Sequence, residues 1–155
     1  MDAKDWITIG ISAYAVVLTT ILAVIGARRR RPRILLRIEP LPLPGTDWTQ
    51  PAGIQVRTTL ANSGGKPFVV SAVTIGILAG PIIADPRPER PIRLPYSLQP
   101  DSRPVQFGCM ARELAMLAGK KDQKGTVKLI ARCENPEGKT YTSKPVEFDI
   151  DVYLE

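Results

Sequence analysis

A long uncharged stretch lies near the start of the chain. Residues 6–27 contain no Asp, Glu, Lys or Arg and are rich in Ile, Val, Leu and Ala. A helix of this length spans about 33 Å, which is enough to cross a hydrocarbon core of about 30 Å. We therefore predict a transmembrane helix over residues 6–27, preceded by a short tail over residues 1–5. A cleaved signal peptide and a buried helix of a soluble domain are the alternatives.

The charges that flank this stretch predict its orientation. Residues 28–33 contain five arginines, and a basic cluster that follows an apolar run is typical of a stop-transfer segment rather than a signal peptide. We expect a single-pass protein of the cell membrane, in contact with the lipid bilayer, with its N-terminus outside and its C-terminal domain in the cytoplasm. The expected membrane-interface residues are one aromatic and five basic residues at the two ends of the span: Trp6, Arg28, Arg29, Arg30, Arg31 and Arg33.

Small residues recur at every fourth position of the predicted span. They are Ala15, Thr19, Ala23 and Ala27. Stripes of this kind allow two helices to approach closely, so they predict packing against another membrane protein or a second copy of the chain. The alternative is ordinary composition, since Ala and Thr are common in such helices.

After residue 33 the pattern changes to alternation of apolar and polar positions. Alternation with period two is typical of antiparallel strands that have one face buried. It occurs in six runs, at residues 34–38, 54–60, 69–77, 105–109, 127–133 and 148–154. We place the last two strands at 125–134 and 139–152. The predicted fold class is all-β: a transmembrane α-helix followed by an Ig-like antiparallel β-sandwich over residues 34–155, with one short helix inserted at 111–117.

Proline is concentrated between the predicted strands. Residues 81–104 hold seven of the 15 prolines, which predicts a stiff, extended loop. Candidate partner-binding residues lie in this loop and in the loop before residue 54: Trp48, Arg87, Arg90 and Arg93.

Composition excludes several kinds of chemistry. The chain has no His, which excludes a Ser-His-Asp triad and any His-ligated zinc site. Cys109 and Cys133 fall on inward strand faces, where they are free thiols in a cytoplasmic domain or a disulfide in an exported one. The net charge of +6 comes mainly from the arginine cluster, so we do not expect nucleic-acid binding.

The last predicted strand carries a row of carboxylates. Glu147, Asp149 and Asp151 share one face, opposite Lys128 and Arg132 of the strand before. Such rows are usually solvated or paired across the sheet. The main hypothesis is thus a non-enzymatic interaction module, an accessory or scaffold component at the cytoplasmic face of a membrane. It has no catalytic residue, metal, cofactor or small-molecule substrate. The alternative is a membrane-tethered, metal-dependent enzyme that uses these carboxylates.

Three turn motifs of the chain resemble those of a known group of proteins. They are Asn62-Ser-Gly-Gly-Lys-Pro, Leu94-Pro-Tyr-Ser-Leu-Gln-Pro-Asp and Gly138-Lys-Thr-Tyr-Thr-Ser-Lys-Pro. With the basic segment they resemble uncharacterised small bacterial proteins, of actinobacterial and phage type, that have one span and a cytoplasmic Ig-like domain. Asp101 stands where those proteins have Gly. The resemblance implies a fold and a topology and carries no activity.

Overall fold

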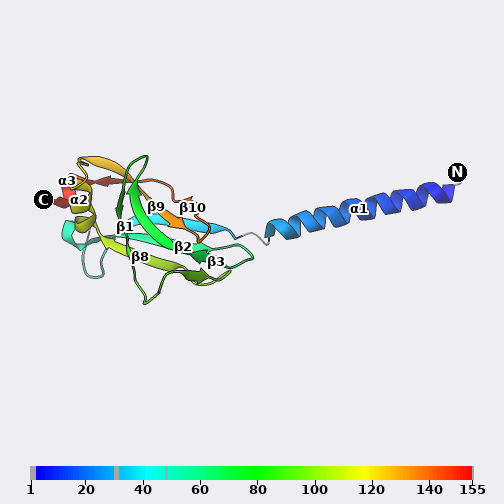
Figure 1. Ribbon diagram of the computed structural model, residues 1–155, viewed down its shortest axis with the longest axis horizontal. Helices are drawn as coiled ribbons and strands as arrows, with labels where there is room; N and C mark the ends of the chain where they lie inside the picture. Colours follow the sequence, from blue (N-terminus) through cyan, green and yellow to red (C-terminus); the bar gives the residue numbers. More distant parts are fainter. Residues whose placement is uncertain (1–2, 30–31, 48, 155) are drawn as a thin grey trace.

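The computed structural model describes residues 3–29, 32–47 and 49–154. In the first helix, α1 (Ala3–Arg29), side chains are described from Ser12 to Ala27. Figure 1 shows α1 projecting from one end of a β-rich domain, with the chain's C-terminus at the opposite end of that domain.

The predicted transmembrane helix over residues 6–27 is wrong. The stretch is helical, but no helix within the described residues combines the length and the apolar content needed to cross a bilayer. Only seven of the residues 12–27 are Val, Leu or Ile, and the other nine are Ala, Gly, Ser, Thr or Tyr. These small and hydroxyl-bearing residues favour insertion less than the large aliphatic ones. The predicted topology in the cell membrane, with an outer N-terminus and a cytoplasmic domain, is overturned by the same finding.

The β-rich part of the fold class agrees with the prediction. Antiparallel pairing forms two main sheets and a small one. The first sheet has the order β1 (Ile34–Pro42), β2 (Ile54–Asn62), β8 (Val105–Met110) and β6 (Arg87–Pro88). The second has the order β10 (Thr140–Thr142), β9 (Thr126–Glu134), β4 (Ala72–Ile77) and β5 (Ile82–Ala84), and β11 (Val146–Asp149) also pairs with β9. The third joins β3 (Phe68–Val70) to β7 (Tyr96–Leu98).

Three short helices complete the domain: η1 (Pro51–Gly53), α2 (Ala111–Gly119) and α3 (Ile150–Leu154). The predicted helix at 111–117 is therefore confirmed and extends to Gly119. α2 and α3 lie together at the end of the domain far from α1 (Figure 1). The structure thus supports an antiparallel β-rich fold with helices at one end.

The two main sheets bury their facing sides against each other. Ile38 and Val56 of the first sheet share one core cluster with Ile75 and Leu129 of the second, and Leu114 of α2 closes this cluster. A second cluster contains residues from β2, β3, β4, β7, β8 and β9: Leu60, Phe68, Val70, Val73, Leu98, Val105, Phe107 and Cys133. The predicted inward alternation is correct for the buried residues of β2, β4, β8 and β9. It is wrong for β3, where Phe68 and Val70 are buried and Val69 is exposed, and β7 was not predicted.

Two predicted strands are interrupted. The run 69–77 divides at Ser71 into β3 and β4, which belong to different sheets, so its buried positions change phase. The run 139–152 divides into β10 and β11 and then ends in α3. There the Asp149 carboxylate accepts a hydrogen bond from the Asp151 amide at 3.1 Å, which favours a turn into the helix.

Asn62 holds the turn that follows it and joins this turn to β7, which is distant in sequence. Its Nδ2 donates to the carbonyl oxygens of Lys66 at 2.8 Å and Leu98 at 3.1 Å, and its Oδ1 accepts from the Gly64 amide at 3.0 Å. Asn62 is only 2% exposed. The turn after β2 is thus held by a buried side chain that also anchors β7.

Candidate partner-binding surface

The segment around β6 lies at the free edge of the first sheet. Arg87 and Pro88 pair with Gly108 and Phe107 of β8, and the Glu89 amide continues this pairing by donating to the Gln106 carbonyl at 2.9 Å. Proline has no amide hydrogen and is tolerated at the edge of a sheet, which explains how a proline-rich segment can form β6. The predicted loop therefore contains short strands, β5, β6 and β7.

An ion pair fixes the segment after β6. Arg57 Nε, on β2, donates to Glu89 Oε1 at 2.7 Å, and both side chains are 27% exposed. Arg57 lies on β2 and Glu89 follows β6, and both of these strands pair with β8 from its two sides. The ion pair therefore reaches across β8. Two hollows lie on the two sides of Glu89, which lines both of them.

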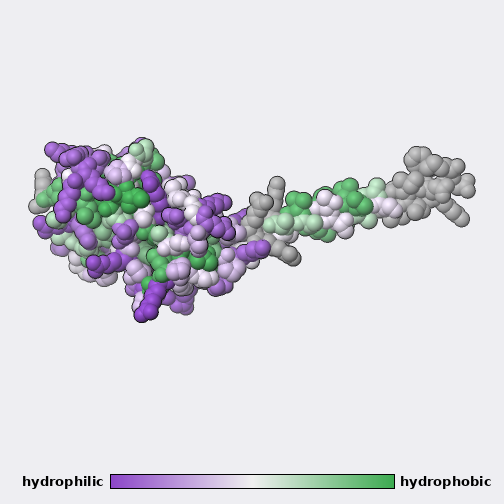
Figure 2. Space-filling view, viewed as in Figure 1, coloured by the Kyte–Doolittle hydropathy of each residue, from purple (hydrophilic) through white to green (hydrophobic). Residues whose placement is uncertain are grey.

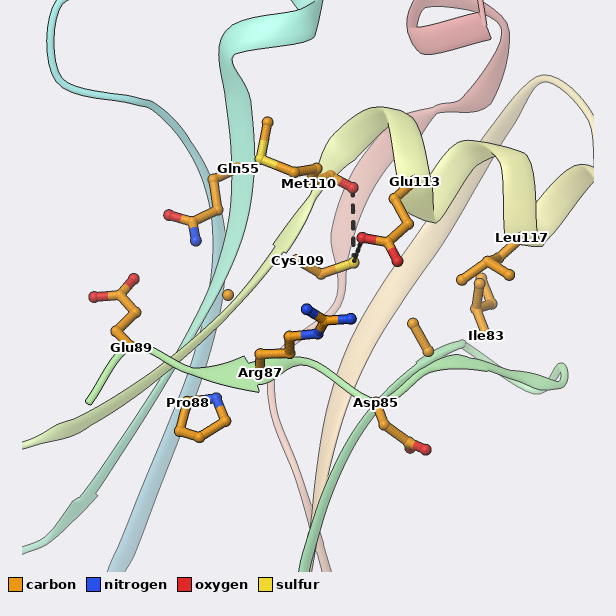
Figure 3. Close-up of a pocket in the computed structure, with 12 residues that line it drawn as sticks. Gln55, Ile83, Asp85, Arg87, Pro88, Glu89, Cys109, Met110, Glu113 and Leu117 are labelled. Carbon is orange, nitrogen blue, oxygen red and sulfur yellow. Dashed lines mark hydrogen bonds between the residues drawn. The ribbon is translucent and has the colours of Figure 1, made fainter. Parts of the chain in front are cut away.

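The first hollow, which we call the thiol hollow, has a volume of about 570 Å³ (Figure 3). β2, β5, β6, β8 and α2 all contribute to its walls, and its principal polar residues are Gln55, Asp85, Arg87, Glu89, Cys109 and Glu113. In Figure 3 the Arg87 guanidinium points toward Cys109 and Glu113. Gly108 forms part of this wall, and a Cβ there would lie 1.9 Å from Gln55 Nε2. The absent side chain thus lets Gln55 lie across β8.

Cys109 is the chemically distinctive group of the thiol hollow. Its Sγ donates weakly to Met110 O at 3.7 Å and to Glu113 Oε2 at 3.8 Å. Burial, with a smaller contribution from the Glu113 charge, raises the pKa of the Cys109 thiol to about 11. The thiol is therefore protonated at neutral pH, and only a thiolate is an effective nucleophile. The hollow does not have the electrostatics of a catalytic cysteine site.

Both cysteines are free and buried, which confirms their predicted inward positions. They belong to different core clusters, and burial also raises the pKa of Cys133 to about 11.

This burial predicts a loss of stability at alkaline pH. The unfolded chain releases both thiol protons near the ordinary pKa of 9.0, whereas the folded chain keeps them until about 11. The stabilisation is complete below pH 9 and is lost as the pH rises toward 11. The free energy of unfolding, measured with urea at pH 8 and pH 10.5, should fall more between these pH values for the native chain than for a Cys109→Ala, Cys133→Ala variant. Equal losses would contradict the prediction.

The second hollow, which we call the arginine groove, has a volume of about 420 Å³. Its walls combine two arginines with apolar and proline residues, and its lining comprises Glu89, Arg90, Pro91, Ile92, Tyr96, Arg103, Pro104, Val105 and Gln106. Ile92 and Tyr96 are half-buried and pack against the second core cluster, so this wall is fixed to the domain. Arg90 and Arg103 are exposed, and neither guanidinium forms a hydrogen bond or ion pair with another residue that the structure describes.

Charge distinguishes the two hollows. The thiol hollow has three carboxylates, on Asp85, Glu89 and Glu113, against one guanidinium, which disfavours an anionic ligand. Among the described residues that line the arginine groove, the only carboxylate is that of Glu89, and Arg57 already holds it. Arg90 and Arg103 thus give the arginine groove an unbalanced positive charge beside an apolar wall.

The structure separates the predicted partner-binding arginines. Arg87 lines the thiol hollow, Arg90 lines the arginine groove, and Arg93 is exposed and lines neither. Trp48 lies outside the described residues. Arg103, Arg57 and Tyr96 were missed in the sequence, because only the pairing of β6 with β8 and of β3 with β7 brings them to this edge.

The predicted membrane-interface residues are only partly described. Arg30 and Arg31 lie outside the described residues, and so do the side chains of Trp6, Arg28 and Arg29. Arg33 is exposed, and its carbonyl accepts a hydrogen bond from the Ser63 amide at 2.9 Å. The expected helix-packing residues Ala15, Thr19, Ala23 and Ala27 are all exposed on α1.

The carboxylates of the last predicted strand do not form one row. Glu147 and Asp149 lie on β11, whereas Asp151 lies on α3. Glu147 pairs in register with Lys128, but no ion pair joins them. Within the described ranges no group of three His, Cys, Asp or Glu residues is placed to hold a metal ion.

No protein-family model matches the chain, and neither the curated proteins nor the solved structures contain a match. The resemblance to small bacterial proteins stays a prediction.

Proposed function

We propose that the protein is a non-enzymatic interaction module that binds an extended acidic segment of a partner protein in the arginine groove. One observation carries the proposal: among the residues that the structure describes, the guanidinium groups of Arg90 and Arg103 have no partner and lie beside an apolar wall, while the only carboxylate that lines the groove is held by Arg57. A partner carboxylate therefore does not have to displace an internal one.

The chemistry of the groove favours a peptide. Guanidinium groups form charge-assisted hydrogen bonds with carboxylates, often through two parallel N–H donors. Tyr96, Ile92 and the flanking prolines supply apolar surface for the side chain between two acidic residues. The expected ligand is an extended stretch with glutamates on both sides of an apolar residue.

Fluorescence anisotropy tests the proposal with a labelled peptide that contains Glu-Leu-Glu flanked by glycine and serine. We expect saturable binding that weakens with salt, because exposed charge pairs are screened. Arg90→Ala and Arg103→Ala should each reduce the affinity about tenfold, which corresponds to the loss of one charge-assisted hydrogen bond.

Arg112→Ala is the matched control. Arg112 is an exposed arginine of α2 that lines neither hollow, so the variant removes the same charge from elsewhere on the surface. A peptide with Gln-Leu-Gln controls for the carboxylates. Equal weakening by Arg112→Ala, or equal binding of the Gln peptide, would show that the groove does not provide the specificity.

A further inference from the structure

We propose that α1 packs in antiparallel orientation against α1 of a second copy of this chain. The first observation is exposure: eight large apolar side chains of α1 are 42–69% exposed, namely Tyr14, Val16, Val17, Leu18, Ile21, Leu22, Val24 and Ile25. Figure 2 shows hydrophobic side chains along the described part of the helix, away from the domain. Val, Ile and Thr are only moderate helix formers, so such a helix depends on packing for its stability.

The large side chains follow a heptad pattern. Tyr14, Leu18, Ile21 and Ile25 are spaced by four, three and four residues, which is the seam of a coiled coil. Val17, Val24 and Leu22 flank this seam and widen it. The opposite side of the helix carries mostly small residues, including Thr19, Ala23 and Ala27 of the small-residue stripe. The seam, rather than the stripe, provides the broad apolar face.

The two threonine hydroxyls of α1 are satisfied within the helix, so they do not prevent burial. Thr19 Oγ1 donates to the Ala15 carbonyl at 2.7 Å, and Thr20 Oγ1 donates to the Val16 carbonyl at 2.8 Å. Residues 12–27 contain no charge. A charged partner helix would lose hydration against this surface without gaining an ion pair, whereas a second copy matches it.

Charge at the two ends selects the antiparallel orientation. Residues 28–33 carry five arginines, whereas residues 1–5 have a net charge of −1. Parallel packing would bring the two arginine clusters together. Antiparallel packing separates them, aligns opposite helix dipoles and places each cluster near the acidic end of the other helix. Full overlap of the two antiparallel copies of α1 (Ala3–Arg29) places their midpoints together at residue 16, so Tyr14 of one copy lies opposite Leu18 of the other.

The packing would place the two domains about 40 Å apart, at opposite ends of the paired helices. Two arginine grooves would then be available to one partner that carries two acidic segments. Once one acidic segment is bound, the effective concentration of the other segment at the second groove is raised.

Disulfide trapping tests the orientation in the full chain. Tyr14→Cys and Leu18→Cys copies, one of them enlarged by a tag, are oxidised separately and as a mixture. We expect cross-linking only in the mixture, and only between unlike copies. Val16→Cys on the outer side of the helix is the control and should stay unlinked. Cross-linking of Leu18→Cys with itself would indicate parallel packing and overturn the proposal.

Analytical ultracentrifugation tests the association itself. The native chain should form a defined dimer, or a tetramer in which two pairs meet through the wide seam. Leu18→Glu should weaken association at least about 100-fold, because it buries an unpaired charge, whereas Thr19→Glu should not. A monomer at all concentrations, dissociation caused by Thr19→Glu, or a monomer that cosediments with phosphatidylcholine vesicles would each overturn the proposal.

Discussion

Replacement of Leu114 by alanine is expected to lower the free energy of unfolding by about 3–4 kcal/mol, which is a decrease of about 10 °C in melting temperature. Leu114 is fully buried and fixes α2 to the first core cluster. The neighbouring buried positions of α2 are Ala111, Ala115 and Ala118. These short side chains cannot move into the space that the leucine leaves, so a cavity remains.

Met116→Ala is the control for this variant. Met116 lies on the same helix but is 51% exposed, so its truncation should change the free energy of unfolding by less than about 0.5 kcal/mol. Urea unfolding followed by circular dichroism measures both variants. Similar losses for the two would mean that helix propensity, and not core packing, determines the contribution of α2.

Replacement of Asn62 by alanine is expected to cost about 3 kcal/mol. The change removes the donor for the Lys66 and Leu98 carbonyls and the acceptor for the Gly64 amide. Leu98 is fully buried and Gly64 is buried, so water does not replace the hydrogen bonds to these two residues without opening the domain. A buried group left without its partner costs about 1–3 kcal/mol.

Asn135→Ala provides the matched comparison. Asn135 also holds a turn, because its Oδ1 accepts from the amides of Glu137 at 3.1 Å and Lys139 at 2.8 Å. That turn is exposed, so water can satisfy the freed amides, and we expect a loss of about 1 kcal/mol or less. Thermal unfolding of the two variants compares the stability lost at the buried turn with that lost at the exposed turn. A loss for Asn62→Ala as small as that for Asn135→Ala would show that the buried network contributes little.

The Asn62 variant also bears on the proposed function. Asn62 anchors β7 through Leu98, and β7 carries Tyr96 into the wall of the arginine groove. A lower peptide affinity of a groove variant therefore reports on binding only when the free energy of unfolding of that variant matches the native value. Arg90→Ala and Arg103→Ala meet this condition best, because both side chains are exposed and unpaired among the described residues.

Local patterns determined the elements whose environment is uniform along their length. Alternation predicted β2, β8 and β9, since each has one face on the core throughout most of its length. The absence of β-branched residues at 111–117 predicted α2. The absence of His likewise excludes a Ser-His-Asp triad and any His-ligated zinc site from this chain.

Tertiary structure alone decided the remaining features. Ser71 divides a continuous alternating run because the two halves pair with different strands, β7 and β9. Alternation of apolar and polar residues in the sequence does not specify which strand each half pairs with.

The arginine groove shows the same division between local and long-range information. Sequence identified Arg90 as an exposed cation in a proline-rich segment, because proline and charge are local properties. It did not identify Arg103 as its neighbour or Arg57 as the residue that holds Glu89, since β2, β6 and β8 meet only through antiparallel pairing across distant parts of the chain. A binding surface is a juxtaposition in space, and only the packing of strands determines which charges remain free to bind.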